Sequence, residues 1–389
     1  KTKIGLSVLA LACVGAGALN LQPNVSAYAE ESTVNTTTAL SMKNGAEVCV
    51  ESDFNGIRWA TTVEAGYLAT ESSQFGVIVA PTKNIEGEFT HGTADVLDIA
   101  FEADTIDTTN GATYYSVIDY ATLSAEFKQE AYALELTARA YVKTTDGYVY
   151  ADLTGVSTAR SARQVAINVE LTGQLDGYRA SEDEVEQAKA TQVVEYYGGT
   201  QYTLTEDKKV FDMNVRVVEK DVFTTAETPS FTVPVTGVTS SENLEVVVDA
   251  ERVNATYADG NVTITDLDYI TDGEHYVSVF QGGTLVDVQP LIYATKVIRK
   301  AEDLRIFNAK GEATSLKVSD AEFAKVNEFP GYYVLGGNIN VSKLEDGTTY
   351  YHGSRKADGT MNNSSWQGYD KYVNKPIGLT GTFNGLGYR

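Results

Sequence analysis

The stretch "NATYADGNVTITDLDYITDGEHYVSVFQGGTLVDV", residues 254 to 288, decides the fold of the second half of this chain. Short runs rich in Val, Thr and Tyr alternate there with the turn pairs Asp259-Gly260, Asp272-Gly273 and Gly282-Gly283. Strands that recur about every 8 to 12 residues between such turns are typical of a β-sandwich. We therefore expect residues 228–295 to form one β-sandwich domain.

The whole chain has the composition of a mainly β, multidomain protein. Its 389 residues exceed one ordinary core, which predicts two or three domains. With 24 Tyr and only 7 Pro, beside many Thr and Val, it favours sheet over helix.

Residues 45–199 read as an α+β domain in which strands come first and helices follow. Asp146-Gly147 between two strand-like runs predicts a hairpin. The run "STARSARQVAINVEL" (157–171) places Ala162, Val165, Ala166 and Val169 on one helical face. A second helix is expected over 181–199, with Ser181 and Glu184 in capping-box spacing and a stop at Gly198-Gly199.

Three further segments complete the predicted organisation. Residues 30–44 are Thr-rich without a steady period and read as a linker, and residues 200–227 read as a connecting segment. Residues 296–389 are expected to be an incomplete module. In its last stretch, "GTFNGLG", we expect Phe383 to point inward and Gly381, Gly385 and Gly387 to be turn residues.

Residues 1–29 have the pattern of a secretory signal peptide. Lys1 and Lys3 precede an apolar stretch over residues 4–19, and Ala27-Tyr28-Ala29 supplies an A-x-A cleavage site. Cleavage after Ala29 fits better than lipidation at Cys13, because the apolar stretch before that cysteine is too short. The product is expected outside the cell or at its surface, with no intramolecular disulfide, since only Cys49 remains.

The charge balance limits the partners. The net charge is -23, and no basic block occurs along the chain. Nucleic acid and anionic membranes would be repelled, so neither is expected to bind. No later apolar run of about 18 residues occurs, so we expect no membrane segment after the signal peptide is removed.

Residue patterns for catalysis are weak, and we expect no enzyme activity and no cofactor. The three histidines, His91, His275 and His352, lie in different segments, and no metalloprotease, serine-hydrolase or phosphate-loop motif occurs. Cys49 alternates with apolar neighbours and reads as a buried strand residue. A Cys49–His91 pair in an unrecognised hydrolase is the weaker alternative.

Two acidic stretches offer oxygen ligands for calcium, although neither follows the EF-hand loop. "DTIDTTNG" contains Asp104, Asp107 and Asn110. "DLDYITDG" contains Asp266, Asp268 and Asp272. Asx turns explain both stretches equally well without a metal.

The stretch "SSWQGYDKY", residues 364–372, is the candidate glycan contact. Trp366, Tyr369 and Tyr372 lie three positions apart in a polar loop, and aromatic faces stack on sugar rings. The alternative is that these rings cap the end of a repetitive core.

Three parts of the chain resemble known families. Residues 45–199 resemble a module repeated in secreted surface proteins of Gram-positive anaerobes, which implies a surface location and no assigned chemistry. The motifs that carry this resemblance are "NGIRWATTVE", "FGVIVAPTKNI", "LTARAYVKTTDGYVYA" and the Ser-Arg-Ser-like helix start "STARSARQVA". Leu267, Gly273 and Tyr276 resemble the entry to strand F of an immunoglobulin-like domain, without its cysteine pair.

The last resemblance concerns residues 296–389. "TKVIRKAEDLRIFNAK", "GYYVLGGNINVSKL" and "GTFNGLG" are similar to the start of parallel β-helix or lectin-like surface modules. This sequence carries Asn338, Asn340 and Asn384 where those modules usually have acids, which argues against a calcium role there.

We therefore expect an exported, non-catalytic surface protein whose modules act as spacers and as adhesive or glycan-binding units. Its partners would be glycans or components of a host or cell-wall surface. The alternative is an accessory region of a larger secreted polysaccharide-degrading enzyme with its catalytic domain beyond residue 389.

Overall fold

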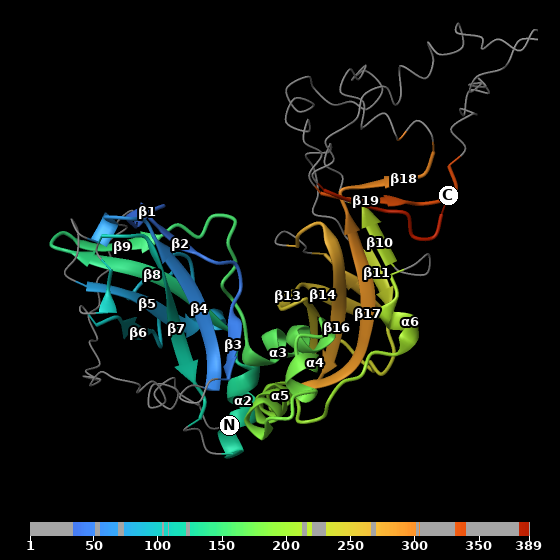
Figure 1. Cartoon of the computed structure of the whole chain (residues 1–389), viewed down its shortest axis with the longest axis horizontal. Coiled ribbons are helices and arrows are strands. Elements are labelled where there is room, and N and C mark those ends of the chain that lie inside the picture. The colour runs from blue at the N-terminus through green and yellow to red at the C-terminus, as the bar shows by residue number, and fades with distance from the viewer. Residues whose placement is uncertain are drawn as a thin grey trace, which may run out of the picture. The chain divides into compact units, whose positions relative to one another are not determined.

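A computed structural model of the chain describes residues 34–50, 55–68, 74–102, 105–107, 109–121, 125–211, 216–219, 231–265, 270–300, 303, 331–339 and 381–388 (Figure 1). Strands make up most of the regular structure, which confirms the expected mainly β fold. The chain divides into two compact units. Unit 1 comprises Lys1–Thr203, Gly237–Val253 and Ser278–Asp287, and unit 2 comprises Leu204–Thr236, Asn254–Val277 and Val288–Arg389.

Unit 1 contains a five-stranded sheet with the order β1-β9-β8-β5-β6. The short strand β1 runs parallel to β9, and the remaining neighbours are antiparallel. The predicted hairpin at Asp146-Gly147 is confirmed, because β8 and β9 pair up to Thr144 and Gly147. The strands are β1 (Thr36–Thr37), β5 (Gln74–Pro81), β6 (Leu97–Ala100), β8 (Leu136–Thr144) and β9 (Gly147–Ala151).

A second sheet of unit 1 is built around one long strand, β4. Strands β2 and β3 pair antiparallel with successive parts of β4, and β7 pairs with it along its full length. The strands are β2 (Leu40–Met42), β3 (Glu47–Val50), β4 (Asn55–Val63) and β7 (Ala112–Asp119). Because β1 and β2 lie inside residues 30–44, the interpretation of that whole segment as a linker is wrong. Strands of two or three residues are too short to show a period in the sequence.

The helices α3, α4 and α5 of unit 1 follow strands β1 to β9, whereas the 3-10 turn η3 and helix α2, which the sequence analysis missed, lie between strands. The predicted apolar face of α3 is confirmed at Ala162, Val165 and Ala166, which are buried, while Val169 is half-buried. The helices are η3 (Thr82–Asn84, a 3-10 turn), α2 (Ala125–Ala133), α3 (Ala162–Leu171), α4 (Asp176–Arg179) and α5 (Glu184–Tyr196).

The capping box predicted for α5 is wrong. The N-cap is Asp183, whose side chain accepts a hydrogen bond from the backbone N–H of Val185. Ser181 instead accepts one from the N–H of Asp183. The capping box of this region belongs to α3, where Ser161 and Gln164 satisfy each other's backbone N–H groups.

Residues 216–294 contribute strands to two sheets with an immunoglobulin-like order. One sheet has the order β11-β15-β14 and the other β10-β17-β16-β12-β13. The first strand, β10, lies beside the last strand, β17. The division of these strands between two sheets agrees with the sandwich predicted from sequence. The strands are β10 (Arg216–Glu219), β11 (Phe231–Pro234), β12 (Leu244–Val248), β13 (Glu251–Val253), β14 (Ala255–Ala258), β15 (Asn261–Ile264), β16 (Gly273–Gln281) and β17 (Thr284–Ala294).

The boundaries of this sandwich differ from the predicted ones. The segment 200–227 is not a mere connection, because it supplies α6 (Glu206–Lys209) and strand β10, which runs parallel to β17. The hairpin β12–β13 belongs to the same compact unit as residues 34–203. A short strand such as β10 is recognised only once its partner is known.

Unit 2 also holds three short parallel strands, β18 (Lys296–Ile298), β19 (Tyr332–Leu335) and β20 (Thr382–Asn384). Segments far apart in sequence therefore form one parallel sheet, while the β-helix or lectin-like module predicted for residues 296–389 stays a prediction. Their hydrophobic cluster contains Ile292, Ala294, Val297, Val334 and Leu386.

The predicted inward position of Phe383 is wrong, because its side chain is 41% exposed. Leu386, three residues later, is buried instead. Gly387 has a φ of 81° and is a turn residue as expected. Gly381 has a different role, because a Cβ at this position would lie 2.1 Å from the carbonyl oxygen of Gly331. The two backbones approach too closely for any side chain.

Candidate functional site

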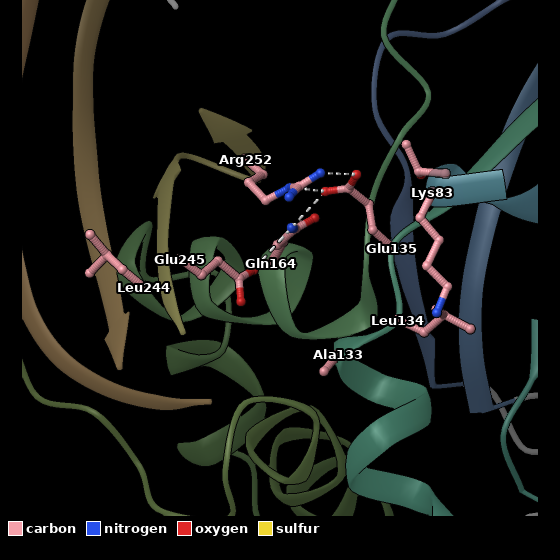
Figure 2. Close-up of a pocket in the computed structure, with 9 residues that line it drawn as sticks. Lys83, Ala133, Leu134, Glu135, Gln164, Leu244, Glu245 and Arg252 are labelled. Carbon is pink, nitrogen blue, oxygen red and sulfur yellow. Dashed lines mark hydrogen bonds and ion pairs between the residues drawn. The ribbon is translucent and has the colours of Figure 1, made fainter. Parts of the chain in front are cut away.

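A cavity of about 260 Å³ lies in unit 1 beside the first turn of α3 (Figure 2). Its walls come from the 3-10 turn η3, the segment between α2 and β8, helix α3, and the hairpin β12–β13. The lining residues are Thr82, Lys83, Ala133, Leu134, Glu135, Gln164, Leu244, Glu245 and Arg252. The cavity therefore combines two carboxylates and two cations with a few apolar side chains.

Glu135 is held by donors from two elements. Arg252 on β13 donates from Nε and Nη2 to the two carboxylate oxygens, at 3.0 and 3.1 Å, which is a bidentate arrangement. The amide nitrogen of Gln164 donates a third hydrogen bond at 3.0 Å. Figure 2 shows these three side chains converging between the hairpin and α3.

Gln164 is a buried bridge between the two acids of the cavity. Its side-chain nitrogen donates to Glu135 at 3.0 Å and to Glu245 at 3.1 Å. Its side-chain oxygen accepts from the backbone N–H of Ser161 at 2.8 Å, as the second half of the capping box. The helix cap therefore fixes the orientation of the amide that separates the two carboxylates.

Two arginines of the helix start extend this network. Arg163 donates to Glu245 and, at 3.3 Å, to the carbonyl of Gly283, and its guanidinium lies 5.1 Å from the ring centroid of Phe280. Arg160 is 4% exposed and pairs with Glu251 at 3.2 Å. Burial lowers the pKa of the Arg160 guanidinium, and the nearby acid Glu251 opposes that shift.

Both carboxylates of this cavity accept hydrogen bonds from guanidinium or amide groups, which join α3, the hairpin β12–β13 and the segment before β8. In Figure 2 no dashed line joins the Lys83 ammonium to the Arg252–Glu135 pair. Within the part of the chain that the structure describes, Lys83 has no ion-pair partner.

The predicted alternative of a Cys49–His91 pair finds no contact among the described residues. Cys49 is buried in β3, as expected from its strand pattern. His91 packs on tyrosines of the other sheet: its ring stacks on Tyr148 at 3.8 Å between centroids, and Nδ1 lies 2.7 Å from the Tyr150 hydroxyl.

Asp98 completes the His91 cluster. It accepts a hydrogen bond of 2.6 Å from the Tyr141 hydroxyl and lies 3.3 Å from Nε2 of His91. Burial is the main cause that raises the pKa of Tyr141 and of Tyr150, so both phenols stay neutral. The His91 ring stacks on one face of Tyr148 and packs edge-on against Tyr141, so this cluster is a packed aromatic group.

His275 lies near the start of β16 and has a structural role there. It is 4% exposed, and its Nε2 lies 2.7 Å from the carbonyl oxygen of Thr271.

The calcium candidates are only partly described. Asp107 accepts hydrogen bonds from the N–H groups of Thr109 and Asn110 and from the Asn110 amide, at 2.8 to 3.1 Å. These bonds lower the pKa of Asp107 and form the Asx turn named as the metal-free alternative. Asp272 accepts a hydrogen bond from the Thr295 hydroxyl.

Several predicted site residues lie outside the described residues. They are Asp104, Asp266 and Asp268 of the calcium candidates, Trp366, Tyr369 and Tyr372 of the glycan candidate, and His352. Among the residues that are described, no group of three or more His, Cys, Asp or Glu side chains is placed to hold a metal ion. No helix in the described ranges has both the length and the apolar character needed to span a bilayer.

The side chain of Asn384 has a structural role as a hydrogen-bond donor. Its side-chain nitrogen donates to the Tyr332 hydroxyl at 2.8 Å and to the Glu274 carboxylate at 3.2 Å. The Tyr332 hydroxyl itself donates to Glu274 at 2.6 Å. An aspartate at this position would face Glu274 as a like charge, so the neutral amide suits this contact better than an acid would.

Comparison with known proteins identifies no family for this chain. No protein-family model matches the sequence, and no curated protein does. Among solved structures, the chain was aligned with one described as "Biofilm associated protein - BSP domain", at 11% identity and a TM-score of 0.17. The alignment covers 70% of this chain and 54% of that chain, so this chain spans about half the length of that structure. A TM-score this low supports no argument about fold or function.

Proposed function

We propose that this chain is an exported, non-catalytic surface protein whose modules act as spacers and as adhesive or glycan-binding units. One observation supports the non-catalytic part: both carboxylates of the cavity beside α3 are hydrogen-bonded to cationic or amide side chains of the same unit. Glu135 and Glu245 are satisfied by Arg252, Arg163 and Gln164, and these contacts hold segments of the chain together.

Localisation is supported by the signal-peptide pattern of residues 1–29 and tested by export. Residues 1–44 fused to a reporter without its own signal should direct secretion from a Gram-positive host. Mass spectrometry of the secreted product should place its N-terminus at Glu30. A reporter that stays inside the cell would refute the proposed export.

Adhesion is tested with the chain from Glu30 to Arg389 on a glycan array and on purified cell-wall fragments. Any glycan that binds should lose about tenfold or more in affinity with Trp366→Ala, because an aromatic anchor contributes much of such binding. Tyr115→Ala is the control, since this tyrosine is 46% exposed on β7. Binding that is unchanged in Trp366→Ala, or no binding to any array member, would refute the glycan role.

Catalysis is tested on a panel of polysaccharides by the release of reducing ends. We expect no release by the chain. Release that is lost in Cys49→Ser or His91→Ala would overturn the non-catalytic proposal.

A further inference from the structure

We propose that the start of α3, residues 160–164, is a docking surface for the hairpin β12–β13, and that this contact makes residues 34–203 and 237–253 unfold together. The inference concerns stiffness and folding, and it holds whether or not the chain binds a glycan. It assigns a role to the Arg-Ser-x-Arg-Gln sequence that begins the helix, for which the sequence alone suggested no partner.

Three ion pairs make the docking contact, and the hairpin supplies the acid in two of them and the cation in the third. At the helix start, Arg160 pairs with Glu251 of the hairpin, and Arg163 pairs with Glu245. In the third pair the roles reverse, because the hairpin contributes the cation Arg252 to Glu135, just before β8. Alternating charges of this kind specify one register, since a shifted hairpin would bring like charges together.

The hairpin presents these charges at fixed spacing. Its strands pair Val246 with Val253, Val247 with Arg252 and Val248 with Glu251. The valines at 246, 247, 248 and 253 are all buried, while Glu245 and Glu251 are half-buried and Arg252 is exposed. The partner that fits the helix start is therefore a valine-rich hairpin with an acid near the start of each strand.

Burial makes two of the pairs sensitive to the loss of either member. Side-chain exposure is 5% and 14% for Arg160 and Glu251, and 13% and 17% for Arg163 and Glu245. Pairs this deeply placed are screened less by salt than surface pairs, and removal of one partner leaves the other charge buried and unpaired.

Arg163 also contacts a second hairpin of the same unit. Its Nη1 donates to the carbonyl of Gly283, in the turn between β16 and β17, and its guanidinium lies over the ring of Phe280. Gly283 has a φ of +85°, and a Cβ there would approach Arg163 Nη1 to 3.1 Å. The turn therefore favours a glycine for its conformation.

Gln164 keeps the two carboxylates of the contact compatible. Glu135 and Glu245 accept one hydrogen bond each from the same amide nitrogen, at 3.0 and 3.1 Å. A third acid at this position would leave three carboxylates together with fewer donors between them. Gln164→Glu is therefore expected to weaken docking, whereas surface substitutions elsewhere in α3 are not.

The experiment uses the chain from Glu30 to Arg389 and follows hydrogen exchange by mass spectrometry in increasing urea. Peptides from residues 136–151 report the first part of the unit, and peptides from 244–253 report the hairpin. In the wild type the two regions should lose protection in one transition. In Arg163→Glu, protection of the hairpin peptides should fall by at least about tenfold relative to the 136–151 peptides, because a buried pair is broken.

The swap Arg163→Glu with Glu245→Arg should restore the single transition, at least in part, since it returns opposite charges to the pair. Arg58→Glu is the matched control, because Arg58 pairs with Glu47 in the same unit without contacting the hairpin. If Arg163→Glu does not fold, Arg252→Ala at the more exposed pair provides the same test in milder form. Two separate transitions in the wild type, or one unchanged transition in Arg163→Glu or in Arg252→Ala, would overturn the proposal.

Discussion

The indole Nε1 of Trp59 donates a hydrogen bond of 2.8 Å to the backbone carbonyl of Thr158, 99 positions further along the chain. Trp59 lies on β4 of one sheet of unit 1 and is fully buried. The Thr158 hydroxyl in turn donates to the carbonyl of Ala138 on β8, at 2.7 Å, in the other sheet. The segment before α3 therefore links both sheets and brings Arg160 and Arg163 to their positions.

Trp59→Phe should destabilise unit 1 by about 1–3 kcal/mol, because it leaves the buried Thr158 carbonyl without its donor. The measurement is urea unfolding followed by circular dichroism, with an unchanged slope. Tyr115→Phe on the exposed part of β7 is the control and should change the stability by less than about 0.5 kcal/mol. Equal midpoints for the two variants would contradict the role assigned to the indole.

Gly56→Ala should destabilise unit 1 by about 1–3 kcal/mol or more, through overpacking of backbone against backbone. A Cβ at Gly56 would lie 1.7 Å from the carbonyl oxygen of Ile118 on β7. Gly177→Ala in α4 is the control, since a Cβ there meets no atom within 4 Å. Thermal unfolding of both variants measures the difference, and a Gly56→Ala protein as stable as the control would show that β4 and β7 can separate without cost.

Gly381→Ala should release β20 from β19, because the added Cβ would lie 2.1 Å from the carbonyl oxygen of Gly331. The amide of Thr382, which donates to that oxygen at 2.8 Å, reports the contact by hydrogen exchange. An overpacking cost of about 1–3 kcal/mol predicts a loss of protection of about tenfold or more. Gly385→Ala has room for its Cβ and should keep the protection. Full protection of Thr382 in Gly381→Ala would mean that the two glycines need not touch.

Glu219 should make unit 2 sensitive to acid. Burial alone would raise the pKa of Glu219, but hydrogen bonds and charge from Arg299 and Lys296 hold the pKa below its ordinary value of 4.5. A lowered carboxyl pKa stabilises the fold above the unfolded pKa, and that contribution is lost as the pH falls through the folded value. The affected window therefore lies below pH 4.5.

The measurement compares wild type and Glu219→Gln by urea unfolding between about pH 6 and about pH 3. We expect the variant to lose less stability over this range, by roughly 1 kcal/mol or less, because the pair is only partly buried. Glu186→Gln, in an i,i+3 pair on α5, is the control for an ordinary surface acid. An identical pH profile for wild type and Glu219→Gln would contradict the prediction.

Much of the local structure could be predicted from the sequence. The Asp146-Gly147 hairpin, the apolar face of α3 and the strand setting of Cys49 follow from period and turn chemistry, which act over a few residues. The strands β1, β2 and β10 and the helix α2 were missed. Two-residue to four-residue strands carry no period of their own and exist only because a longer strand accepts their hydrogen bonds.

The charged junction beside α3 was out of reach of sequence reasoning. Glu135 meets Arg252 across 117 positions, and Gln164 meets Glu245 across 81. Acids and cations this far apart in sequence produce no local pattern. In a chain this acidic, nothing in the sequence distinguishes a glutamate that forms a buried ion pair from the other glutamates. The prediction for Phe383 failed for a related reason: no residue of β20 is buried, and it is Leu386, after the strand, that packs in the cluster with Val297 and Val334.

The sequence by itself determined that this protein is mainly β, where its turns fall, and which helix face is apolar, because these properties are set by neighbouring residues. Only the tertiary structure decided which sheet each short strand joins, which residue caps α5, and that Arg160, Arg163 and Gln164 face a hairpin more than 80 positions away. Those choices depend on the backbone approach and burial that exist once distant segments have come together.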